Sequence, residues 1–253
     1  SPGSSSRRDD QVTELRILPL EGLPEVREGD DLGALIAEAV TLEDKDVVVV
    51  AQKIVSKAEG RVVRLDGVEP SERARELATP EDDPRQIEVI LREAKRIVRI
   101  RESLVIAETA HGFVCASAGV DASNARPGTL VLLPVDPDAS ARSIRDRLAK
   151  LTGRTVAVIV SDSFGRPWRQ GTTDVAIGAA GLVPLADLRG RRDAGGYELQ
   201  STQIAVADEL AGAAELVMGK TDGVPGAVIR GFRPEGDGTA QALVMPAQRD
   251  LFR

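Results

Sequence analysis

The sequence predicts an α+β fold, in which mixed sheets pack against helices. Apolar runs of strand length and segments of helical spacing follow one another without strict alternation, and this does not fit a doubly wound sheet. Residues 46–51 (DVVVVA) form a continuous apolar run, which is typical of a strand buried on both faces. Residues 202–217 place Ile204 and Leu210 on one helical face, and Gly219 marks the end of that helix.

The N-terminal part of the chain begins with alternating residues at 14–20, which predict a strand, and continues with a loop at 22–26. Asp31 is placed to cap a helix over 32–40, because its side chain can accept hydrogen bonds from the first free amides. Residues 70–101 fit one long helix, whose apolar face is Ile87, Ile90, Leu91, Ala94, Ile97 and Val98. We interpret the basic side chains of its other face as solvated rather than anion-binding. They are Arg92, Lys95, Arg96 and Arg99.

Shorter elements make up the rest of the chain. Strands are predicted at 104–107, 112–116, 129–134, 156–160, 178–185 and 227–230. Asp138 is placed to cap a helix over 140–152, which Gly153 ends because glycine readily adopts a left-handed conformation. Residues 187–196 are predicted to be a polar, basic loop, and residues 233–242 have the composition of a linker.

The composition narrows the class of protein. The net charge is -7 and aromatic residues make up 2% of the chain, which argues against a nucleic-acid binder with a basic surface or base-stacking platforms. The single cysteine, Cys115, and the single histidine, His111, exclude an internal disulfide and a Cys/His zinc site within one chain. We therefore expect a reducing, cytoplasmic setting. No apolar run is long enough for a membrane span, and residues 1–13 have the composition of a disordered lead-in rather than a secretory signal.

The segment 159–177 (IVSDSFGRPWRQGTTDVAI) carries the most specific chemical signal. The predicted strand at 156–160 ends at Ser161, Asp162 and Ser163, and a turn with two arginines and the single tryptophan follows. Carboxylate and hydroxyl oxygens suit a hard divalent cation, and arginines suit phosphate or carboxylate. The segment therefore predicts a metal-plus-anion site for phosphoryl chemistry. A strand end with a solvated aspartate and two surface arginines explains the segment equally well.

Three further clusters contain residue types that suit an anionic ligand. Residues 52–60 (QKIVSKAEG) place two lysines and a serine at a strand exit, where they can meet phosphate or form an ordinary surface. Residues 111–124 bring small residues around Asp121 and Asn124, and Asp121 can share a metal pair with Asp162. Residues 215–224 end a helix, so their lysine can contact a nucleotide or belong to a plain cap. Within these clusters Cys115 is expected in the core and His111 is expected to be structural.

At these clusters the chain resembles the coenzyme F-420 gamma-glutamyl ligase family. The resemblance covers nearly all of residues 15–231, and its motifs are specific together although each is weak alone. They are 22–26 (GLPEV), 52–63 (QKIVSKAEGRVV), 108–124 (ETAHGFVCASAGVDASN), 161–178 (SDSFGRPWRQGTTDVAIG), 187–200 (DLRGRRDAGGYELQ) and 215–225 (ELVMGKTDGVP). Residues 243–253 (LVMPAQRDLFR) resemble the junction that leads, in actinobacterial members, into a flavin-binding nitroreductase-like domain.

The resemblance implies an activity and an organisation. Members use GTP to attach L-glutamate to the lactyl carboxylate of a deazaflavin precursor and then extend a gamma-linked chain. They need Mg²⁺ or Mn²⁺, with two ions expected, and potassium stimulates some of them. The resemblance also implies an intertwined homodimer with two closely linked subdomains. Residues 1–13 then form a lead-in, residues 14–232 the ligase domain, and residues 233–253 a linker toward a further domain.

The resemblance also implies roles for single residues. Residues lining the guanine nucleotide are Leu23, Pro24, Glu25, Val26, Gln52, Lys57, Asn124, Met218, Gly219 and Lys220. Gln52 departs from the family pattern, because some relatives have serine there. The metal ligands are Asp121, Asp162 and Ser163, and Ser163 keeps the hydroxyl that many relatives supply as threonine. Lys57 and Arg166 are expected to offset charge during catalysis. Candidates to hold the anionic precursor, or else parts of a solvated loop, are Arg169, Arg189, Arg191 and Arg192.

Two other functions fit the same residues. A metal-dependent phosphatase or nucleotidase would use the acids without any ligation. A nucleotide-binding regulatory module would bind GDP without turnover. The ligase is the function that the resemblance favours.

Overall fold

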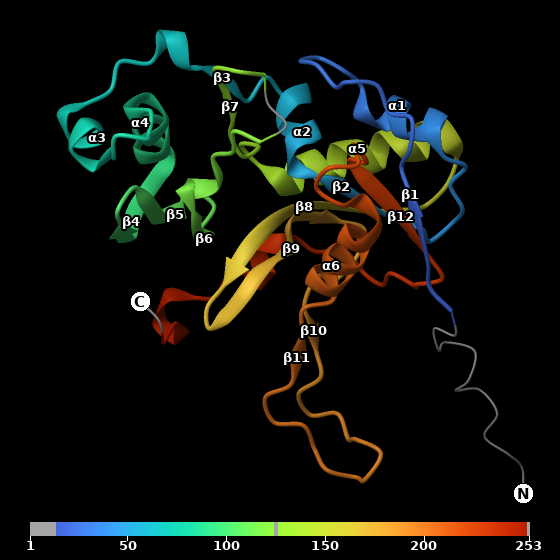
Figure 1. Ribbon diagram of the computed structural model, residues 1–253. Coiled ribbons are helices and arrows are strands. Elements are labelled where there is room, and N and C mark those ends of the chain that lie inside the picture. The colour runs from blue at the N-terminus through green and yellow to red at the C-terminus, as the bar shows by residue number, and fades with distance from the viewer. Residues whose placement is uncertain (1–13, 124–125, 252–253) are drawn as a thin grey trace, which may run out of the picture.

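A five-stranded mixed sheet forms the centre of the protein in a computed structural model, which describes residues 14–123 and 126–251. Its strand order is β1-β12-β2-β8-β9, from β1 (Arg16–Pro19), β12 (Gly226–Arg230), β2 (Val47–Ala51), β8 (Ala157–Arg166) and β9 (Arg169–Ala180). Only β2 and β8 run parallel, and each other neighbouring pair is antiparallel. Together with the helices around it (Figure 1), this confirms the α+β prediction.

The valine run of β2 explains why helices cover both faces of the sheet. Side chains alternate along a strand, so Val48 and Val50 pack into the core that also contains side chains of α1 (Leu32–Ala39) and α5 (Pro137–Thr152). Val47 and Val49 pack on the other side against α6 (Val206–Met218). All four valines are fully buried, which confirms the prediction that both faces of this strand are covered.

Three of the predicted helix ends are confirmed and one cap is wrong. Asp31 caps α1 by accepting a hydrogen bond from the Ala34 amide, Gly153 ends α5 in the left-handed conformation, and Gly219 ends α6. The cap of α5 is Asp136 rather than Asp138, because proline at the first helical position lets the helix start earlier. Asp138 instead accepts hydrogen bonds at 2.8 Å from the amides of Ala179 and Ala240. The first of these amides lies on the edge strand β9.

The single helix predicted over 70–101 is wrong. The region folds as α3 (Glu72–Leu77), α4 (Pro84–Glu93) and β4 (Ala94–Arg101), and Asp83 caps α4. Strand β4 pairs with β5 (Leu104–Thr109), and irregularities in register fall between 94 and 96 and between 97 and 99. Such bulges insert extra residues into a strand. The apolar residues of β4 therefore recur at spacings that mimic a helix.

Smaller elements complete the fold. A three-stranded sheet joins β4, β5 and β6 (Val114–Ala116), and β3 (Val62–Arg64) pairs with β7 (Thr129–Val131). Helix α2 (Gln52–Ala58) follows β2 directly. Strands β10 (Ala186–Asp187) and β11 (Gln203–Ile204) form the base of an arm that projects from the body (Figure 1). Short 3-10 helices lie at Leu65–Gly67, Ser117–Gly119, Ala240–Leu243 and Ala247–Arg249.

Strand β8 does not end where the sequence predicted. It continues through Ser161, Asp162 and Ser163 to Arg166, turns at residues 167–168 and returns as β9. The predicted turn is therefore the outer part of a long hairpin, in which residues 161–165 of β8 pair with residues 172–176 of β9. Of the strand predicted at 178–185, only residues 178–180 belong to β9, and a turn follows at Gly181.

Residues 233–251 contact the body of the protein. The Asp237 carboxylate accepts a hydrogen bond from the Gly181 amide at 2.8 Å, and Ala240 is fully buried. That this stretch leads toward a flavin-binding domain stays a prediction. Among the helices of the described ranges, none combines the length and the hydrophobicity that a membrane span requires.

Candidate active site

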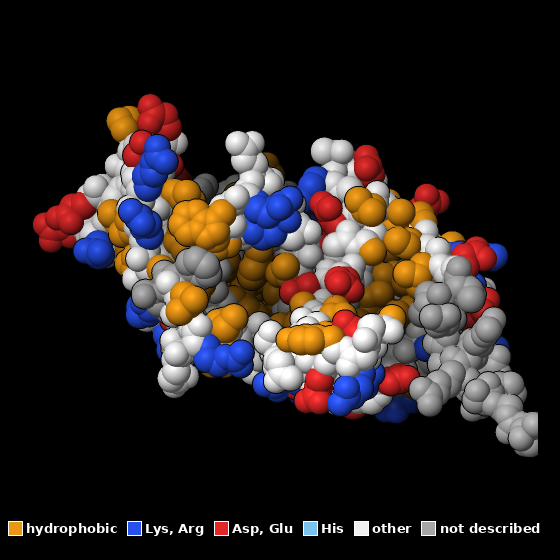
Figure 2. Space-filling view, turned by 90° about the horizontal axis from the view of Figure 1, so that it is seen from below, with side chains coloured by type: hydrophobic (Ala, Val, Ile, Leu, Met, Phe, Trp, Pro, Cys, Tyr) orange, Lys and Arg blue, Asp and Glu red, His pale blue; other side chains and the backbone are white. Residues whose placement is uncertain are grey.

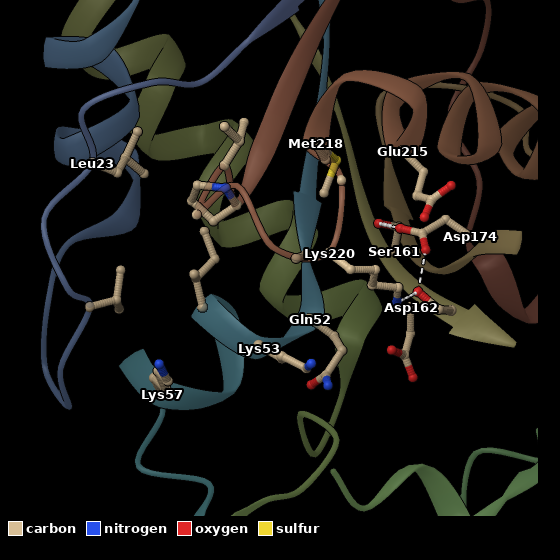
Figure 3. Close-up of a pocket in the computed structure, with 18 of the residues that line it drawn as sticks. Leu23, Gln52, Lys53, Lys57, Ser161, Asp162, Asp174, Glu215, Met218 and Lys220 are labelled. Carbon is tan, nitrogen blue, oxygen red and sulfur yellow. Dashed lines mark hydrogen bonds between the residues drawn. The ribbon is translucent and has the colours of Figure 1, made fainter. Parts of the chain in front are cut away.

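A pocket of about 400 Å³ lies at the end of β2 and beside the middle of β8. The loop after β1, the start of α2, the hairpin β8–β9 and the segment after α6 all contribute side chains to it. In Figure 3, Leu23 and Lys57 lie at one side of the pocket and Asp162, Asp174 and Glu215 at the other, with Gln52 and Lys53 between them. Three acidic side chains thus gather at one side of the pocket, where Lys220 also lies, and Lys57 lies at the other. Figure 2 shows one face of the molecule, hollowed at its centre where acidic and hydrophobic side chains meet.

The pocket brings together most of the residues that the sequence singled out. Eleven of them line it: Leu23, Pro24, Glu25, Val26, Gln52, Lys57, Asp162, Ser163, Met218, Gly219 and Lys220. Residues from four separate parts of the chain therefore share one cavity. Asp121 lies beside it, because its carboxylate pairs with the pocket residue Lys53. Asn124 lies outside the described residues.

The hydroxyls of β8 are held by a buried carboxylate. Ser161 Oγ donates a hydrogen bond to Asp174 at 2.8 Å, and Ser163 Oγ donates to the other oxygen of the same carboxylate. The Lys220 ammonium donates in turn to Ser163 Oγ. Asp174 is 5% exposed. Because the Ser163 proton is directed at Asp174, its oxygen can accept from Lys220 with one lone pair and offer the other to a cation.

Asp162 points to the opposite side of β8 from these serines, as alternation along a strand requires (Figure 3). Burial raises the pKa of Asp162 to about 7, and the negative charges of Asp174 and Asp121 add to that rise. Burial and the charge of Asp162 also raise the pKa of the Cys115 thiol to about 12. Cys115 is therefore a core residue, as predicted, and not a nucleophile.

Asp121 is held in an ionised state. Burial disfavours its charge, but hydrogen bonds from Lys53 and the Ser123 amide outweigh that effect, so its pKa lies below the ordinary value. Lys53 Nζ lies 2.7 Å from Asp121 Oδ2, and the Ser123 amide donates to Oδ1 at 2.6 Å. Both carboxylate oxygens thus have a donor, and one of those donors carries a full positive charge.

The oxygen ligands of this site suit a divalent cation. Within residues 14–123 and 126–251, no three His, Cys, Asp or Glu side chains gather closely enough to hold a metal ion by themselves. Mg²⁺ commonly binds through one or two carboxylates and takes its other ligands from water and substrate phosphates. Asp121, Asp162 and the Ser163 hydroxyl provide ligands of that kind. Burial raises the pKa of Asp162 most, the charges of Asp174 and Asp121 add to the rise, and a bound cation would offset those two charges.

Comparison with known proteins identifies the family. The family model described as F420-0:Gamma-glutamyl ligase matches residues 22–231. The chain belongs to this ligase family. It is 51% identical to a protein of Methanopyrus kandleri named Coenzyme F420:L-glutamate ligase, over 94% of this chain and 98% of that protein. Proteins of the same name from Methanothermobacter thermautotrophicus and Methanocaldococcus jannaschii are 46% and 45% identical over 94% of the chain, covering 99% and 97% of their own lengths.

The family resemblance seen in the motifs is thus confirmed, but several of its residues lie outside the pocket. Arg166 is exposed on the hairpin, where it donates to the Gln170 carbonyl at 3.3 Å. Arg169 lies on the same exposed hairpin. Arg189 pairs with Asp187 at the base of the arm. Arg191 and Arg192 lie farther out, and Arg192 donates to the Gly196 carbonyl at 2.9 Å. Their roles toward the precursor stay predictions.

The histidine has a structural role, as expected. Its Nε2 lies 2.9 Å from the Pro134 carbonyl oxygen and 3.1 Å from that of Val135, and its ring stacks on Phe113. These contacts hold the segment after β7 against the end of β5. A catalytic triad built on His111 is therefore not supported.

Three charged residues of the pocket have no role predicted from the sequence: Lys53, Asp174 and Glu215. The motif segments contain all three. Lys53 is one of two lysines at a predicted strand exit, and Asp174 lies in the segment 159–177 without a predicted role. Lys53 contacts Ser123, which is 70 residues away in the chain, and Asp174 contacts Ser161 across the hairpin, so local spacing gives no sign of these contacts.

Gln52 presents an unused hydrogen-bond donor at the pocket wall. Its side chain is 1% exposed, and its Oε1 accepts a hydrogen bond from Ser56 at 2.9 Å. Its Nε2 has no partner among the described residues. A buried donor without a partner is costly to a protein. A ligand oxygen or ring nitrogen in the pocket would supply the missing acceptor.

Proposed function

We propose that this protein uses GTP to join L-glutamate to the lactyl carboxylate of the deazaflavin precursor of coenzyme F-420, through an acyl phosphate. Family membership supports the ligation, and the relatives named above carry that reaction in their name. One observation supports the nucleotide: a single pocket collects eleven residues that the family motifs associate with nucleotide and metal. Gamma-linked extension of the glutamate chain is part of the same proposal.

The proposed chemistry follows from the poor reactivity of a carboxylate toward an amine. A carboxylate oxygen of the precursor attacks the γ-phosphorus of GTP, the bond to the β-phosphate oxygen breaks, and GDP leaves. The glutamate amine then attacks the acyl carbon, loses a proton, and expels phosphate to leave an amide. The expelled phosphate retains one oxygen from the precursor, which balances the reaction.

Catalysis of phosphoryl transfer depends mainly on positioning the reactants and on neutralising the charge of the phosphate oxygens. Asp121, Asp162 and Ser163 would hold Mg²⁺ or Mn²⁺, which supplies neutralisation of the phosphate oxygens when bound. Lys57 and Lys220 line the same pocket and would hold the phosphates as point charges. Arg166 would have to approach from the hairpin to share that role. Potassium and a homodimer belong to the proposal through the family resemblance, and a cytoplasmic setting belongs to it through the single cysteine.

The decisive assay is the mass of the product. The protein is incubated with precursor, GTP, Mn²⁺ and glutamate, and matched reactions omit one component each. We expect precursor carrying added glutamate only in the complete reaction. GTP hydrolysis that needs neither precursor nor glutamate would point to a phosphatase. Tight GDP binding with no product and no hydrolysis would point to a regulatory module.

Gln52→Glu tests the nucleotide assignment. The change keeps the shape and the acceptor toward Ser56 but replaces the free donor by a carboxylate, which repels phosphate and cannot donate. We expect GDP affinity, measured by calorimetry with Mn²⁺ present, to fall at least about tenfold, which corresponds to about 1.4 kcal/mol. Gln248→Glu makes the same change at an exposed position away from the pocket and should leave affinity unaltered. Equal affinities of the two variants would refute the role of Gln52.

A further inference from the structure

Lysine ammonium groups contact two of the three oxygen ligands that the proposed function gives to the metal. Lys53 Nζ lies 2.7 Å from Asp121 Oδ2, and the Lys220 ammonium donates to Ser163 Oγ. Each ammonium therefore takes one of the lone pairs that the oxygen could offer to a metal ion. Lys53 is the more informative of the two, because its partner is a full negative charge.

The contact between Lys53 and Asp121 is well enclosed. The two side chains are 16% and 33% exposed, so water screens their attraction only in part. Lys53 Nζ also donates to Ser123 Oγ at 2.5 Å. The other oxygen of Asp121 is taken by the Ser123 amide. A cation on Asp121 Oδ2 would lie within a few Å of the ammonium, so the repulsion between the two positive charges favours displacement of Lys53.

A displaced Lys53 ammonium has the pocket itself to enter. It belongs to the first turn of α2 and lines the pocket, between the acidic side and Lys57 (Figure 3). A flexible four-carbon stem lets the ammonium swing from Asp121 into the cavity. Phosphate oxygens bound in the cavity would then pair with the ammonium, as they commonly do with lysine.

We propose that Lys53 is a displaceable internal counter-ion of Asp121, which a divalent cation replaces and which is then released to the nucleotide phosphates. The proposal rests on the metal role of Asp121 in the proposed function. It makes metal and nucleotide binding mutually favourable, because phosphates that accept Lys53 free Asp121 for the cation. By thermodynamic linkage the cation strengthens nucleotide binding by the same factor.

Removal of the positive charge of Lys53 tests directly whether its ammonium and Mn²⁺ compete for Asp121. Lys53→Met keeps the length of the side chain and removes the ammonium. We expect Mn²⁺ to bind this variant about tenfold more tightly than the wild-type protein, with no nucleotide present, as measured from free Mn²⁺ by electron paramagnetic resonance. We also expect GDP to tighten Mn²⁺ binding less in Lys53→Met than in the wild type, because the coupling through Lys53 is lost.

Lys57→Met is the matched control. Lys57 lies one turn along the same helix and lines the same pocket, but it forms no ion pair with a carboxylate of the described residues. Its removal should change Mn²⁺ affinity less than about threefold. Lys53→Gln, which keeps a hydrogen-bond donor for Asp121, should change Mn²⁺ affinity in the same direction as Lys53→Met. It preserves the test if Lys53→Met fails to give a cooperative thermal melt.

Unchanged or weaker Mn²⁺ binding by folded Lys53→Met and Lys53→Gln would overturn the inference. The product-mass assay on the wild-type protein judges the proposed function separately. If the wild-type protein adds glutamate but binds Mn²⁺ with the same affinity as both variants, the inference is overturned and the proposed function stands. Absence of Mn²⁺ binding by every protein, together with absence of product, would overturn both.

Discussion

Asp162→Asn should lose metal-dependent glutamate addition by about a thousandfold while the protein stays folded. An asparagine of the same shape keeps the strand pairing of β8 but cannot compensate the charge of a cation, and electrostatic contributions of this kind are among the largest in catalysis. The measurement is the initial rate of glutamate addition with saturating Mn²⁺ and GTP. Glu38→Gln, an exposed change on α1, is the control and should retain full turnover.

The same variant should be more stable than the wild type at pH 8. The pKa of Asp162 rises from 3.8 in the unfolded chain to about 7 in the folded protein, because the site is buried and negatively charged. The folded state therefore binds more protons between these values, so this group lowers the free energy of unfolding as the pH rises through them. We expect a higher melting temperature for Asp162→Asn at pH 8, and a difference that vanishes near pH 4.

Near-normal turnover in the folded variant would refute the metal role of Asp162.

Gly178→Ala should destabilise the protein by about 3 kcal/mol, because there is no room for a methyl group. A Cβ at this position would lie 2.2 Å from the carbonyl oxygen of Pro137 and 2.4 Å from its carbonyl carbon. These are backbone atoms in the first turn of α5, so relief requires the whole helix to move away from β9. The free energy of unfolding, measured by urea titration, is the readout.

Gly165→Ala is the matched control for that substitution. It lies in the same hairpin, on β8, and a Cβ there would meet no atom within 4 Å. We expect it to change the free energy of unfolding by less than about 1 kcal/mol. Similar stabilities of the two variants would contradict the close packing of α5 on β9.

The parts of the fold that the sequence predicted well are those with a strong local signal. The valine run of β2 is apolar at every position, so burial on both faces was the natural interpretation. Asp31 and Gly153 mark helix ends through their own backbone chemistry. Strand β4 was mistaken for helix because its bulges alter the spacing of its apolar residues. Such bulges depend on pairing with β5, and pairing is not visible in local spacing.

The residues of the site also differ in how visible they are in the sequence. The oxygen-rich segment 161–163 of β8 and the loop after β1 can be recognised because each is a short contiguous motif. The contact of Lys53 with Asp121 and that of Ser161 with Asp174 could not, since each depends on how strands align in space. For the arginines of the arm, charge is a weaker signal. Arg189 pairs with its neighbour Asp187, and a role of these arginines toward the precursor stays a prediction.

The most direct test of the central claim follows a heavy oxygen isotope from the precursor carboxylate. The protein is given precursor labelled in both carboxylate oxygens, together with GTP, Mn²⁺ and glutamate, and the phosphate released is analysed by mass. The proposed acyl phosphate predicts that each phosphate carries one labelled oxygen for each amide formed. Unlabelled phosphate accompanying labelled amide would show that the carboxylate never accepts the phosphoryl group, and the account would be wrong.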